Sequence, residues 1–162
     1  MYIKKLELKV TYLLRFLQFP DNKGWITQTY SWPMLRKEGF LQPFLYEGEC
    51  MIPYKNTFRG FHFQKEPRAA SMLVRCVRGK VLVVVVDMKK SSDSYKQYEI
   101  LELSDTNNCQ IITEKGFAHA FLSLEDDTFL QFKMDEPYDS LLMKSFCWND
   151  PQLGIVWPEK YQ

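Results

Sequence analysis

The chain has 162 residues, of which 46% are hydrophobic and 25% charged, and its formal net charge is +1. This composition predicts a single globular domain over residues 1–162 that folds without a metal or disulfide. The 21 basic and 20 acidic residues give no basic excess, which argues against nucleic acid and membrane partners. The longest aliphatic run, residues 81–86, is too short to span a bilayer. We therefore expect a cytoplasmic protein.

The first predicted element along the chain is a short helix over Trp32–Glu38. Ser31 can cap its N-terminus, Pro33 lies in its first turn, and Gly39 can end it in a left-handed conformation. Helical periodicity is otherwise scarce in the sequence, so the other elements are expected to be strands.

Two runs rich in β-branched residues, Met72–Val77 and Val81–Met88, predict a hairpin that turns at Gly79. The second run is apolar on both faces, which predicts a central strand covered on both sides. Other strands are predicted at Gln97–Leu103, Cys109–Thr113, His119–Leu124 and Thr128–Lys133, split by turn residues. The fold class is therefore all-β, either a jelly-roll sandwich or an open barrel.

The four cysteines, Cys50, Cys76, Cys109 and Cys147, are widely spaced and form no C-x-x-C pair. We expect buried free thiols and no zinc site. With only two histidines and no metal-binding motif, the sequence predicts no protein metal site.

The segment Arg59–Gln64 is the most informative one for function. Strand alternation predicts that His62 and Gln64 share one face and that Arg59 lies on the other. A single histidine inside a β-barrel can be a satisfied core residue, and the same interpretation applies to His119 taken alone. Two inward histidines at the starts of two strands favour a small-ligand site instead.

Four motifs in this chain resemble those of the dTDP-4-dehydrorhamnose 3,5-epimerase family, in the same order. They are Arg59-Gly60-Phe61-His62-Phe63-Gln64, Leu73 to Val81, Gly116-Phe117-Ala118-His119-Ala120-Phe121, and Trp148 to Pro158. The stretch Asp21-Asn22-Lys23-Gly24-Trp25 resembles the family's opening motif. The resemblance implies a cupin jelly roll, a double-stranded β-helix, that forms a homodimer by exchanging N-terminal strands and needs no cofactor.

Members of that family act on nucleotide-diphosphate sugars whose C4 ketone acidifies the hydrogens at C3 and C5. The resemblance implies that His62 is the general base, a task that suits imidazole because its pKa lies near neutral pH. It also implies that Asp150 is the carboxylate that orients His62 and raises its basicity. The alternative interpretation of Asp150 is a turn residue before Pro151.

Further substrate contacts follow from the same resemblance. Arg59 matches an arginine near the diphosphate, although a surface ion pair is the alternative. Tyr138 matches a tyrosine that stacks near the nucleoside, and His119 matches a second histidine that faces the sugar. The remaining candidate substrate-binding residues are Gln64 in the first motif and, from the exchanged N-terminal segment, Lys23, Trp25 and Gln28.

Three departures from the family pattern fall on residues that carry chemistry. Phe132 replaces a tyrosine that protonates the opposite face of the sugar, and Met72 replaces a lysine that stabilises the enolate. Val83 replaces an aspartate, which leaves His119 without its usual partner. The sequence therefore predicts a divergent member, a nucleotide-sugar epimerase with an altered substrate or single-carbon specificity. The alternatives are a 3,4-ketoisomerase and a non-catalytic nucleotide-sugar-binding paralogue.

Overall fold

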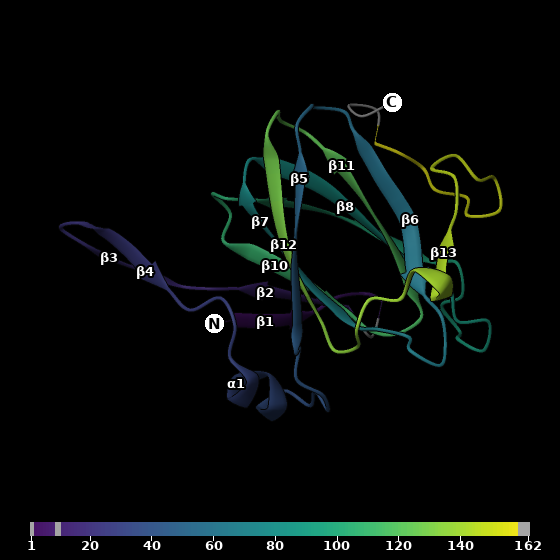
Figure 1. Ribbon diagram of the computed structural model, residues 1–162, viewed down its shortest axis with the longest axis horizontal. Coiled ribbons are helices and arrows are strands. Elements are labelled where there is room, and N and C mark those ends of the chain that lie inside the picture. The colour runs from purple at the N-terminus through teal and green to yellow at the C-terminus, as the bar shows by residue number, and fades with distance from the viewer. Residues whose placement is uncertain (1, 9–10, 159–162) are drawn as a thin grey trace.

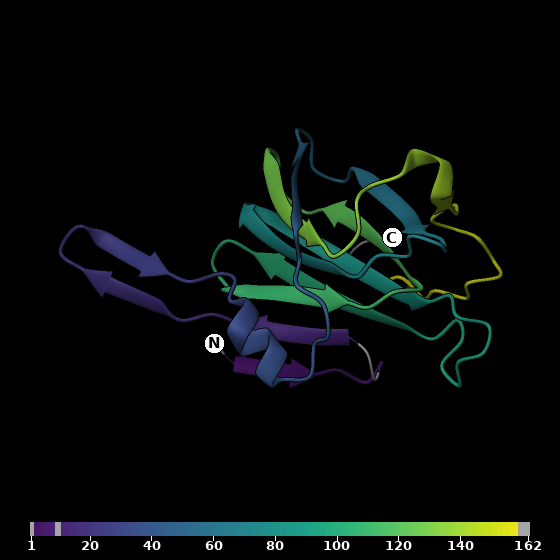
Figure 2. The ribbon, with the colours of Figure 1, turned by 60° about the horizontal axis from the view of Figure 1, so that its bottom comes forward.

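A computed structural model describes residues 2–8 and 11–158, and it is built around two antiparallel β-sheets packed face to face (Figures 1 and 2). The first sheet has the order β1 (Tyr2–Lys5), β2 (Thr11–Arg15), β10 (Cys109–Thr113), β7 (Met72–Arg78), β12 (Thr128–Met134) and β5 (Tyr46–Ile52). The second has the order β13 (Met143–Ser145), β6 (Phe58–Gln64), β11 (Phe117–Ser123), β8 (Lys80–Asp87) and β9 (Tyr98–Ser104). The all-β prediction is confirmed. That residues 1–162 form one domain stays a prediction, and its ends lie outside the described residues.

Strand β8 shows why the chain forms a sandwich. Val81, Val83 and Val85 face inward and join a core cluster with side chains from both sheets. Val84 and Val86 face outward and pack against a second cluster on the outer side of their sheet. Because both faces are covered, β8 lies between β9 and β11, as the doubly apolar pattern predicts.

The predicted hairpin between β7 and β8 is wrong. The two strands lie in different sheets, where β7 pairs with β10 and β12 while β8 pairs with β9 and β11. Gly79, with φ of 77°, turns the chain from one sheet into the other. Glycine between two β-branched runs is needed for either kind of turn, so the sequence alone does not separate a hairpin from a corner between sheets.

The predicted helix is present as α1 (Trp32–Lys37), on the outer face of the first sheet (Figure 2). Leu35 is completely buried against a cluster that includes Leu14 and Ile112, and burying a leucine stabilises a fold by about 2 kcal/mol. Gly39 has φ of 94°, as predicted for the residue that ends the helix. Ser31 occupies the N-cap position but its side chain makes no capping hydrogen bond, so that part of the prediction is wrong.

The four strands predicted after β8 are present as β9, β10, β11 and β12. Two further features of the fold were not predicted from the sequence. A hairpin of β3 (Gln18–Asp21) and β4 (Gly24–Thr27) extends away from the sandwich (Figure 1), and a 3₁₀ turn, η1 (Ser140–Leu142), precedes β13. All four cysteines are free, but only Cys76 is buried and Cys147 is exposed. No helix in the described ranges is long and apolar enough to cross a membrane.

A β-bulge in β6 decides which side chains reach the interior. His62 pairs with His119 and Arg59 pairs with Phe121, so three steps along β6 match two along β11. Gly60 absorbs the extra residue with φ of 124°, and a Cβ there would lie 2.7 Å from the Ala120 Cα. The bulge therefore turns Arg59 toward the same side as His62, which corrects the prediction that they face opposite ways.

The bulge predicts that Gly60→Ala destabilises the protein more than Gly39→Ala. Both glycines have positive φ, which costs an alanine roughly 1–2 kcal/mol, but only Gly60 also abuts the backbone of β11. We expect a total loss above about 3 kcal/mol for Gly60→Ala, measured by urea unfolding. Equal losses for the two variants would contradict the close approach of β6 to β11.

Candidate functional site

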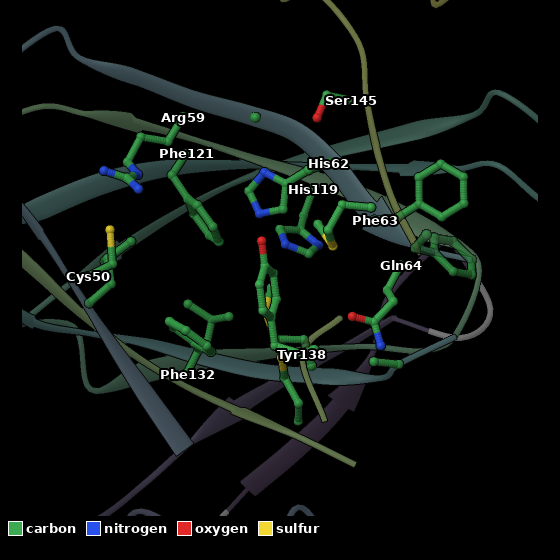
Figure 3. A pocket seen from close by; sticks show the side chains of 18 of the residues that line it. Cys50, Arg59, His62, Phe63, Gln64, His119, Phe121, Phe132, Tyr138 and Ser145 are labelled. Carbon is green, nitrogen blue, oxygen red and sulfur yellow. The ribbon is translucent and has the colours of Figure 1, made fainter. Parts of the chain in front are cut away.

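A cavity of about 620 Å³ opens between the two sheets and has two chemically different walls (Figure 3). The wall formed by β6 and β11 carries Arg59, His62, Gln64 and His119, while Glu49, Cys50, Tyr138 and Ser145 line the cavity from other elements. The wall formed by β7 and β12 is apolar and consists of Met72, Val74, Leu130, Phe132 and Met134. Proton-transfer chemistry is therefore concentrated on the β6 and β11 side.

The two histidines lie side by side at the centre of the polar wall. Their residues face each other across the β6 and β11 ladder, and the ring centroids are 4.3 Å apart in an edge-to-face arrangement. Burial lowers the pKa of His62, and the positive charge of Arg59 lowers it further. His62 is thus neutral near pH 7, which is the form in which an imidazole accepts a proton.

His119 is buried more deeply than His62. Burial, with a smaller contribution from His62, lowers its pKa well below the ordinary value. Its Nδ1 atom is buried and has no hydrogen-bond partner among the described residues. Val85 on β8 pairs with His119, and Val83 lies two pairs further along the ladder, opposite Phe121. The neighbours of His119 on β8 are thus valines, and the expectation that an acidic partner has been lost stays a prediction.

Arg59 is the cation of this wall. Within residues 2–8 and 11–158 it forms no ion pair, so the guanidinium is available to an anion, and the alternative of a surface ion pair is not supported. The same residues provide no cluster of three His, Cys, Asp or Glu side chains that could hold a metal. An anionic group at the cavity mouth is the ligand that this wall favours.

Asp150 lies in the loop after β13. Its carboxylate accepts a hydrogen bond from the Gln152 backbone N–H at 2.9 Å. It is not among the described residues that line the cavity, and the charge that acts on the pKa of His62 is that of Arg59. The structure thus gives Asp150 the local turn contact of the alternative interpretation, and its pairing with His62 stays a prediction.

Gln64 and Tyr138 both lie at the mouth of the cavity. The Gln64 side chain is 4% exposed and its amide bonds to three backbone groups of neighbouring loops. Tyr138 is 66% exposed, and its hydroxyl points toward His62 and His119 (Figure 3). The structure therefore brings Tyr138 to the site, as expected, while the Gln64 amide is occupied by the protein itself.

Lys23, Trp25 and Gln28 do not reach this cavity within one chain. They belong to the projecting hairpin and the segment after it, and Trp25 is 57% exposed. Sequence reasoning also missed Cys50 and Ser145, which line the cavity from β5 and β13. These two strands are short or irregular in hydrophobic pattern, so no periodic signal in the sequence identifies them.

Comparisons with known proteins agree with the fold and the site. The model of the dTDP-4-dehydrorhamnose 3,5-epimerase family matches residues 5–162. A Sinorhizobium fredii enzyme of that name is 34% identical over 159 residues, which cover 98% of this chain and 82% of the relative.

Two solved structures are close in fold. The Bacillus anthracis dTDP-4-dehydrorhamnose 3,5-epimerase with TDP and PPi bound has a TM-score of 0.92 at 32% identity, covering 97% of this chain and 90% of that one. A 3′-monoepimerase from Streptomyces bikiniensis in complex with dTDP-quinovose has a TM-score of 0.88 at 26% identity, covering 95% and 78%.

The fold and the site together define a cupin jelly-roll isomerase that acts on nucleotide sugars. The chain belongs to the dTDP-4-dehydrorhamnose 3,5-epimerase family.

The burial of the histidines predicts their titration. Because the chain has only two, NMR can follow each ring, and both midpoints should lie below the ordinary 6.5, with His119 lower than His62. Arg59→Gln should raise the His62 midpoint and Arg36→Gln, on α1, should not. In the unfolded chain both rings have their higher, ordinary pKa, so protonation favours unfolding. The free energy of unfolding should therefore fall as the pH drops below 6.5. Midpoints above 6.5 would contradict the burial.

Proposed function

We propose that this protein epimerises a nucleotide-linked 4-keto-6-deoxyhexose at a single carbon, with His62 as the base. The observation that carries the proposal is the bulge in β6, which places the neutral His62 and the cationic Arg59 on one wall of a cavity large enough for a sugar nucleotide. Family membership supports the reaction class.

The chemistry begins with removal of a proton from carbon 3 or 5, next to the ketone. The proton moves to a ring nitrogen of His62, the C–H electrons form a carbon–carbon double bond, and the ketone oxygen becomes an enolate. A proton returned to the same carbon from the opposite face completes the inversion. The imidazolium then loses its proton to solvent, so no redox step or cofactor enters the balance.

We assign substrate binding to the residues at the mouth of the cavity. Arg59 is placed to hold the diphosphate, because its unpaired guanidinium can bind phosphate oxygens bidentately. Tyr138 offers an aromatic face to the nucleoside, and neutral His119 contacts the sugar. Relatives with TDP or a dTDP-sugar bound support a thymidine nucleotide, which a panel of dTDP, CDP, GDP and UDP would check.

Asp150 is proposed to pair with His62 when substrate is bound. Ser145, which pairs with His62 in the β6 and β13 ladder, lies five residues earlier in the chain. A carboxylate on one ring nitrogen would raise the basicity of His62 against the effect of burial and Arg59. Asp150→Asn would then slow proton removal, and an unchanged rate would assign Asp150 to the turn alone.

The apolar wall is the reason why we propose inversion at only one carbon of the sugar. Phe132 has no proton to donate, and Met72 offers no charge to an enolate, a loss worth about 3 kcal/mol or a hundredfold in rate. Inversion at one carbon then depends on water or on the Tyr138 hydroxyl as the slower proton source. The same wall favours the second candidate, a 3,4-ketoisomerase, in which His62 returns the proton on the face from which it took it.

The resemblance also implies a homodimer, and the composition implies a cytoplasmic location; both stay predictions. The projecting hairpin exposes Phe19, Trp25 and Ile26 on a two-stranded element that is rarely stable alone. Exchange between two copies would cover these side chains and bring Lys23, Trp25 and Gln28 to the partner's cavity. The molar mass in solution decides between one and two copies.

Incubation in deuterated water with dTDP-4-keto-6-deoxyglucose tests the reaction. We expect one deuterium at carbon 3 or carbon 5, detected by NMR, and a loss of about 10²- to 10⁴-fold in His62→Asn. Binding of dTDP by this variant, measured by calorimetry, should persist because Arg59 and Tyr138 are intact.

Two other results would replace the proposal. A keto group found at carbon 3 would identify the ketoisomerase. Bound dTDP with no deuterium in the sugar would identify a non-catalytic binding protein.

The apolar wall predicts that Phe132→Tyr adds a proton donor opposite His62. We expect deuterium at the second carbon in this variant, with at least a tenfold rise in exchange there, since general acids contribute about 10²–10⁴-fold. Phe121→Tyr is the matched control, because it adds the same hydroxyl to the histidine wall. A second deuterium in both variants, or in neither, would contradict the role of the wall.

A further inference from the structure

We propose that Gln64 is a positioning residue that fixes Tyr138 at the mouth of the cavity. This inference rests on the proposed contact of Tyr138 with the nucleoside. It differs from the expectation that Gln64 binds the substrate directly.

The hydrogen bonds of the Gln64 amide carry the inference. Its Nε2 donates to the backbone oxygen of Arg68 at 2.5 Å and to that of Pro137 at 2.9 Å. Its Oε1 accepts from the backbone N–H of Asp139, also at 2.9 Å. Both amide hydrogens are used, so none is left for a sugar. Two of the three hydrogen bonds join Gln64 to Pro137 and Asp139, the residues directly before and after Tyr138.

No hydrogen bond or ring contact in the described chain holds the Tyr138 side chain. It is 66% exposed and makes no hydrogen bond or ring contact with other described residues. Its place therefore depends on the backbone of its own loop. The Gln64 side chain is 4% exposed, and leaving a buried hydrogen-bonding group unpaired costs about 1–3 kcal/mol.

The loop has other attachments, but they lie at its ends or on the surface. The Ser71 backbone N–H donates to Asp135 Oδ1 at 2.7 Å, and the Lys65 backbone N–H donates to the Leu142 oxygen at 3.0 Å. The ion pair between Arg68 and Asp139 spans 3.9 Å and is largely exposed, so it contributes little. These contacts hold residues 135 and 142, while Gln64 acts at the centre of the loop.

A fixed aromatic ring binds a nucleobase more tightly than a mobile one, because less freedom is lost on binding. Stacking of a base on an aromatic side chain is worth about 1–3 kcal/mol, and loosening the ring removes part of that. The clamp, meaning the hydrogen bonds that join the Gln64 amide to the backbone beside Tyr138, should therefore change the affinity for the nucleotide.

The experiment compares Gln64→Met with Gln110→Met. Gln110 is also buried, at 1% exposure, and donates to the Thr29 oxygen at 2.7 Å, far from the cavity. In Gln64→Met we expect faster hydrogen exchange over residues 136–140 and about a tenfold weaker Kd for dTDP. Gln110→Met should lose comparable stability with none of these changes.

Two further variants test whether the effect of Gln64 acts through Tyr138. In a Tyr138→Ala background, Gln64→Met should not weaken dTDP binding further. Gln64→Glu keeps an acceptor for the Asp139 N–H but loses both donated bonds to the Arg68 and Pro137 oxygens, so it should also speed exchange over residues 136–140. It provides the second variant if the Gln64→Met protein does not fold.

The outcomes separate the clamp from the proposed function. Unchanged exchange over residues 136–140, or an equal loss of dTDP affinity in the Tyr138→Ala background, would overturn the clamp. Faster exchange in a protein that binds no dTDP would support the clamp and contradict the nucleotide-binding part of the proposed function.

Discussion

The close approach of Gly60 to β11 is the constraint on which the site depends. Only a residue without a Cβ fits against the Ala120 backbone, and its positive φ inserts the extra residue of the bulge. Without that residue, strict alternation would send Arg59 to the outer face of the sheet. The cavity would then keep its histidines and lose its cation.

Burial lowers the pKa of both histidines, with different consequences for each. It keeps His62 neutral and ready to accept a proton, and it also lowers the basicity with which that proton is held. For His119 burial is stronger and its Nδ1 is unpaired, so this ring contributes shape and hydrogen bonding but no charge. Met72 adds an apolar side chain to the opposite wall of the cavity, so the polar groups of β6 and β11 face an apolar surface.

The apolar wall and the Gln64 clamp divide the cavity into two functions. Met72 and Phe132 provide no titratable group on their wall, and in the proposed function this limits proton transfer to the other side. Gln64 holds the loop of Tyr138, which concerns the binding of the nucleotide. Because these groups lie on different strands and loops, substrate affinity and reaction outcome can change independently in this fold.

The sequence by itself determined the all-β class, the central strand β8, the short helix and, through its ordered motifs, the family and the residues His62, His119 and Arg59. These follow from local periodicity and from residue types in fixed order. Only the tertiary structure decided that β7 and β8 form a corner, that Arg59 shares a face with His62, and that the Gln64 amide is occupied by backbone. Each of these depends on pairing between segments distant in the chain, which a local pattern does not encode.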